Sequence, residues 1–166
     1  LDAVEGAKTS QWAENNYFGK PCGLMDQTAC ALGKLVYIDF EKPETPKIEN
    51  IEYDFDKKGY SIIITNVHAD HADLTQEYAA ITQEMRAVAA YFGKETLREV
   101  NEKLFYDSLS GLRIQVSDRA VMRAMHFFDE DKRVEAAVTA VKNDDMKTFL
   151  NCVNASGESS WKLLQN

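Results

Sequence analysis

Two carboxylates, Glu14 and Asp26, are the residues whose type and spacing best suit chemistry, and a glycine-containing loop separates them. A helical pattern ends near Gly19, a second glycine follows at Gly23, and Asp26 stands where the next helix should begin. The positive end of a helix stabilises a carboxylate by about 0.3–1 kcal/mol and attracts anions such as phosphate. The arrangement therefore suits a proton-transfer site, although an aspartate in this place is also a common helix N-cap.

The composition narrows the classes of protein in which these carboxylates could act. Of the 166 residues, 45% are hydrophobic and 28% are charged, as expected of a soluble globular protein. The net charge of -8 argues against binding to nucleic acid or to an acidic membrane, because such binding requires basic patches. We see no signal peptide and no apolar run that could span a bilayer. Three cysteines without a CxxC pair indicate reduced thiols in a cytoplasmic protein.

Hydrophobic periodicity predicts an α/β (α+β) fold in which a small mixed sheet is covered by helices. We expect helices over residues 3–17, 25–32, 73–92, 118–128 and 131–142, a last helix capped by Asp144, and strands over residues 35–40, 48–55 and 60–67. The strand over 60–67 is almost entirely apolar, which is typical of a strand covered on both faces. Gly93 is expected to end the helix that contains Tyr78, a residue placed by its spacing on the buried stripe of that helix.

A resemblance to a known family adds to these patterns. Residues 14–27 read Glu-Asn-Asn-Tyr-Phe-Gly-Lys-Pro-Cys-Gly-Leu-Met-Asp-Gln, and they resemble the centre of the galactokinases, members of the GHMP family of small-molecule kinases. The specific part is Cys-Gly-Leu-Met-Asp-Gln at 22–27. An apolar segment ending in Asn66, Tyr78 at the family's spacing after it, and residues 133–137 extend the resemblance to nearly the whole chain.

The resemblance implies a role for four residues. Asp26 would be the active-site aspartate, which accepts the proton of the galactose 1-hydroxyl as its oxygen attacks the γ-phosphate of ATP, and such bases contribute about 10²–10⁴-fold. Glu14 would help to hold Mg²⁺ beside the ATP phosphates, in keeping with the preference of Mg²⁺ for carboxylate, phosphate and water oxygens. Gly23 would let the backbone approach the sugar, and Tyr78 would contact it.

Several motifs of the family are absent from this chain. We find no phosphate loop resembling Pro-x-Gly-x-Gly-Leu-Ser-Ser-Ser-Ala, no upstream arginine with Glu-His-x-Asp, and no late glycine-rich motif. The resemblance therefore implies the middle of a longer polypeptide whose N- and C-terminal parts are missing here. Residues 1–41 would end the N-terminal lobe, and residues 42–166 would start the C-terminal lobe. We expect no kinase activity from this chain alone.

Three alternatives remain open at the level of sequence. The parent could be a galactokinase-like sensor that binds sugar and ATP without turnover. It could act on a related sugar such as N-acetylgalactosamine, because most residues that read the sugar's substituents are not in this chain. Finally, the segment His68–Asp73 contains two histidines and two aspartates, which could ligate a metal that activates water in a hydrolase.

Overall fold

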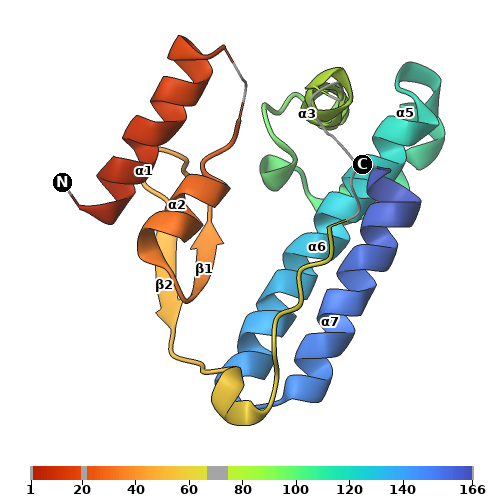
Figure 1. Ribbon diagram of the computed structural model, residues 1–166. Helices are drawn as coiled ribbons and strands as arrows, with labels where there is room; N and C mark the ends of the chain where they lie inside the picture. The colour runs from red at the N-terminus through yellow and green to blue at the C-terminus, as the bar shows by residue number, and fades with distance from the viewer. Residues whose placement is uncertain (1, 20–21, 67–74, 166) are drawn as a thin grey trace. The chain divides into compact units, whose positions relative to one another are not determined.

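The computed structural model describes residues 2–19, 22–66 and 75–165 of the chain. Two compact units are present, Leu1–Ile63 and Ile64–Asn166, and each has its own set of elements (Figure 1). The segment His68–Asp73, and with it the metal site suggested for a hydrolase, lies outside the described residues.

The first unit combines helices with a hairpin. Its elements are α1 (Ala3–Trp12), the π-helical turn η1 (Ala13–Tyr17), α2 (Met25–Leu32), β1 (Leu35–Asp39), β2 (Lys47–Ile51) and the 3-10 turn η2 (Asp56–Lys58). Asp2 caps α1 by accepting a hydrogen bond of 2.9 Å from the backbone N–H of Glu5. The helical run ends as predicted at Gly19, whose φ of +67° is readily adopted by glycine.

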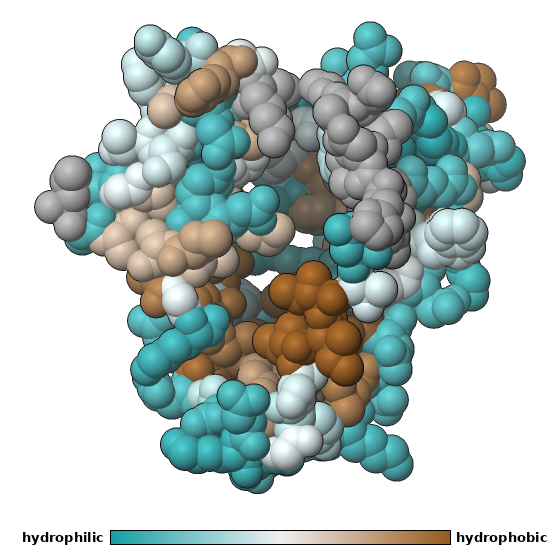
Figure 2. All heavy atoms as spheres, in the orientation of Figure 1, coloured by the Kyte–Doolittle hydropathy of each residue, from teal (hydrophilic) through white to brown (hydrophobic). Residues whose placement is uncertain are grey.

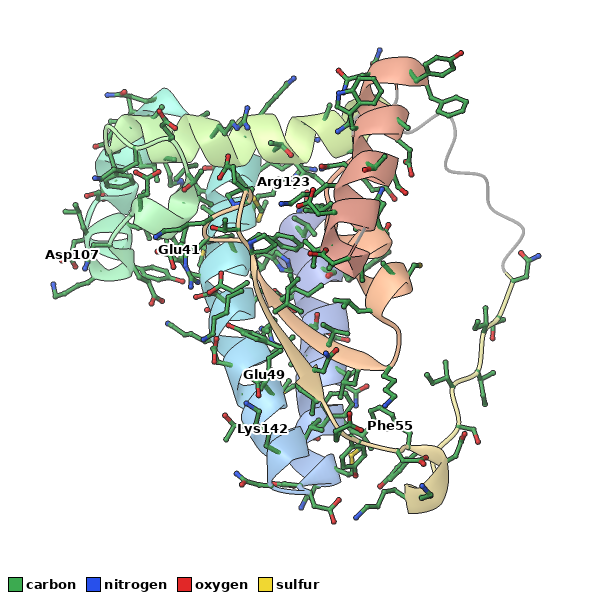
Figure 3. The ribbon with its side chains drawn as sticks, turned by 90° about the vertical axis from the view of Figure 1, so that its left-hand side faces the viewer. Glu41, Glu49, Phe55, Asp107, Arg123 and Lys142 are labelled. Carbon is green, nitrogen blue, oxygen red and sulfur yellow. The ribbon has the colours of Figure 1, made fainter. Side chains whose placement is uncertain are left out.

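The sheet of the described residues is a two-stranded antiparallel hairpin. Leu35 of β1 pairs with Ile51 of β2, and Tyr37 pairs with Glu49. Tyr37 and Ile51 are buried. Glu49 of β2 is labelled in Figure 3. The predicted fold class, mixed α and β with a small sheet, is confirmed, and the sheet is antiparallel rather than mixed. The structure is richer in helix than in strand.

The strand predicted over 60–67 is not found in its described part. Residues 60–66 lie outside any helix or strand, and Ile62, Ile63 and Ile64 are 85%, 86% and 91% exposed. A strand needs a neighbour to bond its backbone N–H and C=O groups. No described segment provides this neighbour, because the sheet holds β1 and β2 alone. Figure 2 shows apolar side chains gathered at the surface on the face where this segment runs in Figure 1.

The second unit is helical. Its elements are α3 (Thr75–Tyr91), the 3-10 turn η4 (Leu97–Glu99), α4 (Glu102–Asp107), α5 (Leu109–Gln115), α6 (Asp118–Lys142), α7 (Met146–Ser159) and the π-helical turn η5 (Ser160–Leu164). Its core is formed by side chains from α3, α4, α5 and α6, among them the fully buried Val88, Phe105, Leu112 and Ala124. Gly93, with φ of +67°, follows the end of α3 as predicted.

One helix replaces two of the predicted ones. The sequence pattern predicts helices over 118–128 and 131–142, whereas α6 runs through both without a break. The acidic residues between the two predicted helices lie within α6, and two of them are paired: Glu130 with Arg133, and Asp131 with Arg98. The cap of α7 also differs by one position, since Asp145 accepts the hydrogen bond from the Thr148 N–H.

Candidate functional site

Glu14 lies in η1, where the structure leaves it half-buried. The side-chain amide of Gln27, on α2, donates a hydrogen bond of 3.2 Å to Glu14 Oε1. The same amide nitrogen lies 3.4 Å from the Sγ atom of Cys22. A residue next to Asp26 therefore joins the two segments that carry the predicted site carboxylates.

The chain that leads into α2 is held by side-chain amides at Cys22. The Cys22 N–H donates to Asn15 Oδ1 at 2.8 Å, and the Asn15 amide donates back to the Cys22 carbonyl oxygen at 3.3 Å. Gln11 of α1 donates to the same carbonyl oxygen at 3.2 Å. Because both backbone groups of Cys22 are bonded, the start of α2 is fixed against α1 and η1.

Asp26 is the second residue of α2, and its side chain is exposed. The N-cap position is occupied by Leu24, and no side chain caps this helix within the described part of the chain. Asp26 is therefore not an N-cap, which removes the simplest structural explanation for an aspartate at this place. Its carboxylate lies in the first helical turn, where the helix dipole interacts favourably with negative charge.

Two buried residues hold the start of α2 in place. Leu24 is 8% exposed, and Thr28 is fully buried and donates its hydroxyl hydrogen to the Leu24 carbonyl oxygen at 2.7 Å. Asp26 stands on the opposite, solvent-facing side of this turn. The arrangement presents a carboxylate on a rigid helix end, which is what a positioned base or a hydroxyl-binding group requires.

Gly23 lies in open space. A Cβ atom built at this position would meet nothing within 4 Å, and the backbone φ is not in the left-handed region. Neither crowding nor backbone conformation therefore demands glycine here. The empty space above the backbone is compatible with the close approach of a ligand, so the predicted contact between Gly23 and a sugar stays a prediction.

Tyr78 lies near the beginning of α3 in the second unit and is 51% exposed. Its expected place on a buried stripe is wrong, because the core contacts of α3 begin further along, at Met85 and Val88. An exposed ring with a hydroxyl remains suited to a sugar. Because Tyr78 and the two carboxylates belong to different units, a shared site stays a prediction.

No group of three or more histidine, cysteine, aspartate or glutamate residues in the described ranges is arranged to hold a metal ion. All three cysteines, Cys22, Cys30 and Cys152, are free thiols, as the sequence predicts. Sequence reasoning missed the amides of Gln11, Asn15 and Gln27. The available signal was their position, since Gln27 ends the most specific motif of the chain.

Comparisons with known proteins bear on this arrangement of residues. No protein-family model matches the chain. A galactokinase of Actinobacillus pleuropneumoniae is 35% identical over 150 residues, which is 88% of this chain and 37% of that protein. A galactokinase of Haemophilus influenzae (strain PittEE) is 33% identical over 165 residues, which is 96% of this chain and 40% of that protein. The resemblance to galactokinases is confirmed.

A third galactokinase, of Glaesserella parasuis serovar 5, is 35% identical over 153 residues. The chain spans between 37% and 40% of the length of these curated galactokinases, although they match nearly all of it. It is therefore similar to a part of each of these kinases. None of the helices described combines the length and the apolar composition needed to cross a bilayer.

Proposed function

We propose that this chain forms the central part of a galactokinase that transfers the γ-phosphate of ATP to the 1-hydroxyl of galactose. The observation that carries the proposal is Asp26, which lies exposed in the first turn of a helix that no side chain caps within the described residues. The similarity to galactokinases over nearly the whole chain supports it. Residues 1–41 would end the N-terminal lobe of this kinase, and residues 42–166 would begin its C-terminal lobe.

Asp26 is proposed to orient the sugar hydroxyl and accept its proton. The hydroxyl oxygen forms the new bond to the γ-phosphorus, the bond between that phosphorus and the β,γ-bridging oxygen breaks, and ADP leaves. Because phosphoryl transfer depends mostly on positioning and charge stabilisation, orientation by a fixed carboxylate is as important as proton removal. The rigid start of α2, held by the buried Leu24 and Thr28, supports this role.

Glu14 is proposed to hold Mg²⁺. One of its oxygens accepts the Gln27 amide, and the other makes no hydrogen bond within the described residues, so it is available to a cation. One carboxylate fits the habit of Mg²⁺, which binds one or two carboxylates together with phosphate oxygens and water. When bound, the cation neutralises charge on the phosphate oxygens. Gly23 and Tyr78 are proposed to contact the sugar.

The test uses a polypeptide of full galactokinase length that contains this chain. We expect Asp26→Asn to lower kcat by about 10²–10⁴-fold, with galactose and ATP still bound, because the change removes the base and keeps the shape. The control is Asp56→Asn, which alters another exposed aspartate at the start of a helical turn in the same unit. It should leave kcat unchanged.

The outcomes separate the possible functions. Unchanged turnover in Asp26→Asn would overturn the role of Asp26. An unaltered polypeptide that binds galactose and ATP without turnover would be a regulator rather than a kinase. A preference for N-acetylgalactosamine in kcat/KM would change the proposed sugar. The 166-residue chain alone is expected to show no turnover, since the family's phosphate loop is absent from it.

A further inference from the structure

The side chain of Gln27 is oriented by its two contacts. Its amide nitrogen donates to Glu14 Oε1 at 3.2 Å and approaches Cys22 Sγ at 3.4 Å. The opposite orientation of the amide would place its carbonyl oxygen against the carboxylate of Glu14, and two acceptors repel each other. The nitrogen therefore faces Glu14, and the oxygen is turned away from it.

The remaining oxygen of Gln27 is a buried acceptor without a donor. Gln27 Oε1 is the one buried side-chain nitrogen or oxygen atom in the described residues that has no hydrogen-bond partner. Buried polar atoms nearly always have a partner, and leaving one unsatisfied costs about 1–3 kcal/mol. The amide therefore keeps this orientation for the contacts of its nitrogen with Glu14 and Cys22, although its own oxygen is left without a donor among the described residues.

We propose that Gln27 is a positioning residue, which fixes the carboxylate of Glu14 through its amide nitrogen and so leaves the other oxygen of that carboxylate to the bound cation. The inference rests on the proposed function, since it assigns Glu14 to the cation. It adds a residue that acts through Glu14 and does not touch the reacting atoms.

The chemistry of the pair supports this role. A carboxylate that binds a cation is usually held by an outer hydrogen bond, which fixes its orientation and leaves its other oxygen to the metal. The amide of Gln27 provides such a bond to Oε1. One amide thereby fixes the orientation of the carboxylate and leaves its second oxygen to the cation.

The test measures how much Mn²⁺ strengthens ATP binding to the full-length polypeptide, by isothermal titration without sugar, so that no turnover is needed. We expect Gln27→Met, which keeps the size of the side chain, to reduce this strengthening about tenfold, the usual effect of losing an outer partner of a metal ligand. Gln27→Asn keeps an amide that is too short to reach Glu14, and it should have the same effect. Thermal unfolding checks that each variant is folded.

Two further variants separate positioning from general damage. In a Glu14→Gln background, Gln27→Met should cause no additional loss, because Gln27 acts through Glu14. Asn16→Ala removes a neighbouring amide that donates to the Trp12 carbonyl oxygen and contacts neither Cys22 nor Glu14, and it should leave the Mn²⁺ effect unchanged. Equal losses in both backgrounds, or no loss in Gln27→Met and Gln27→Asn, would overturn the inference.

The failure of this inference is distinct from the failure of the proposed function. A polypeptide that phosphorylates galactose but responds to Mn²⁺ equally with and without the Gln27 amide is a kinase without this positioning residue. A polypeptide that loses the Mn²⁺ effect in Gln27→Met but never phosphorylates a sugar keeps the positioning residue and is not a kinase. If Mn²⁺ does not strengthen ATP binding in the unaltered polypeptide, the inference is wrong.

Discussion

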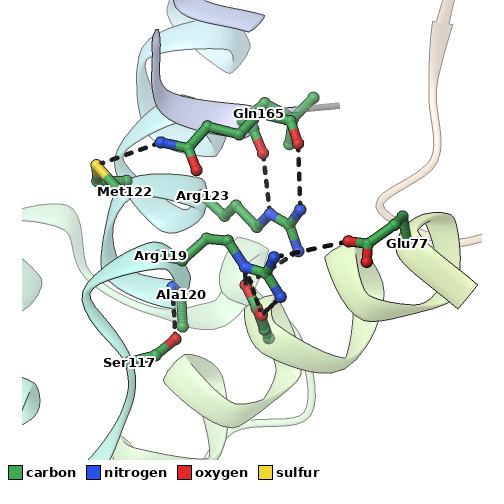
Figure 4. Close-up of polar contacts among 9 residues, drawn as sticks. Glu77, Ser117, Arg119, Ala120, Met122, Arg123 and Gln165 are labelled. Atoms are coloured by element: carbon green, nitrogen blue, oxygen red, sulfur yellow. Dashed lines mark hydrogen bonds and ion pairs between the residues drawn. The ribbon is translucent and has the colours of Figure 1, made fainter. Parts of the chain in front are cut away.

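Arg123 of α6 and Glu84 of α3 form an ion pair in which Nη1 lies 3.0 Å from Oε2. The guanidinium of Arg123 also donates to the carbonyl oxygen of Leu164 at 2.9 Å and to that of Gln165 at 3.4 Å (Figure 4). Arg123 is fully buried, with 0% of its surface exposed. The buried guanidinium of Arg123 therefore links α6 to α3 and to the residues that follow α7.

We expect Arg123→Ala to lower the free energy of unfolding by about 1–3 kcal/mol, because the carbonyl oxygens of Leu164 and Gln165 lose their donor while Glu84 keeps its ion pair with Arg119. Arg123→Lys should restore only part of the loss, since an ammonium group cannot reproduce the forked contacts of a guanidinium. Chemical denaturation, followed by circular dichroism, measures the difference.

Arg119 provides a matched control for Arg123. It donates to the same carboxylate, with Nη2 2.6 Å from Glu84 Oε1, but its side chain is 42% exposed. Arg119→Ala should therefore cause a much smaller loss, because exposed ion pairs are weakened by solvent. Equal losses in the two variants would contradict the importance assigned to burial.

His126 should make the stability of the second unit depend on pH. Its Nδ1 atom lies 2.9 Å from Ser159 Oγ, between α6 and α7. Burial lowers the pKa of His126 below 6.5, an effect that Arg133 reinforces and that the carboxylates of Glu130 and Asp129 oppose. The unfolded chain thus binds this proton more readily than the folded chain. Stability from this residue is complete above about pH 6.5 and declines as the pH falls below it.

The comparison for this prediction is the pH dependence of the unfolding free energy in the unaltered chain and in His126→Gln. The decline below about pH 6.5 should be smaller in the variant, because the titrating group is gone. Ser159→Ala should keep the decline, since it leaves the imidazole buried. Identical slopes in the unaltered chain and His126→Gln would show that His126 does not control this dependence.

Asp145 should stabilise α7 through its charge as well as its shape. It accepts hydrogen bonds from the hydroxyl group of Thr148 at 2.6 Å and from the Thr148 N–H at 3.0 Å, and these bonds lower the pKa of Asp145 below 3.8. Its contribution is therefore complete above about pH 3.8 and is lost as the pH falls toward the lowered pKa. Asp145→Ala should lower the melting temperature at neutral pH.

The neighbouring position tests whether the assigned cap is correct. Asp144→Asn should change the melting temperature less than Asp145→Asn, because the Thr148 contacts are made by Asp145. Asparagine also tolerates the positive φ of +58° at position 144. A larger effect at position 144 would restore the cap predicted from the sequence.

The exposed isoleucines should cause the 166-residue chain to self-associate. Ile62, Ile63 and Ile64 are consecutive and almost completely exposed, and Figure 3 shows side chains projecting from both sides of this segment. Exposed apolar segments with free backbone groups pair readily with other chains. Sedimentation velocity should show association that rises with concentration and is reduced in Ile62→Lys/Ile64→Lys.

A single exposed isoleucine is the control for this prediction. Ile114, near the end of α5, is 85% exposed and stands apart from the segment in sequence. Ile114→Lys should leave association unchanged, since isolated surface isoleucines are ordinary. If Ile114→Lys reduced self-association as much as Ile62→Lys/Ile64→Lys, the added positive charge rather than the apolar segment would explain the effect.

Local signals in the sequence predicted several elements correctly. Gly19 and Gly93 end helical runs with positive φ, which the absence of a side chain makes easy. The hairpin strand over 35–40 was readable from its β-branched and aromatic residues. These features depend on neighbours along the chain, so a single sequence contains what is needed to predict them.

Features that depend on distant partners were less predictable. The run 60–66 has the composition of a buried strand, but strand formation requires another strand beside it, and the described sheet offers none. The continuity of α6 also differs from the prediction: Asp131 lies within the helix, where it pairs with Arg98, far away in sequence. The missing neighbour of the run 60–66 is a contact that periodicity does not encode.

The candidate site shows the same division. The motif drew attention to Glu14 and Asp26, and the structure adds that Asp26 is exposed and does not cap its helix. The contact between Gln27 and Glu14 joins residues 13 positions apart on two elements. Only the approach of α2 to η1 brings them together, so the motif could single out Gln27 but could not predict its contact with Glu14.

The contacts of Arg123 with Leu164 and Gln165 also have a consequence for biosynthesis. The ribosome makes the arginine about 40 residues before its carbonyl acceptors. Until those last residues emerge from the exit tunnel, the guanidinium has Glu84 but lacks two of its hydrogen-bond acceptors. The nascent helices α3 and α6 can associate early, but the hydrogen bonds of Arg123 to Leu164 and Gln165 form only after those two residues have been translated.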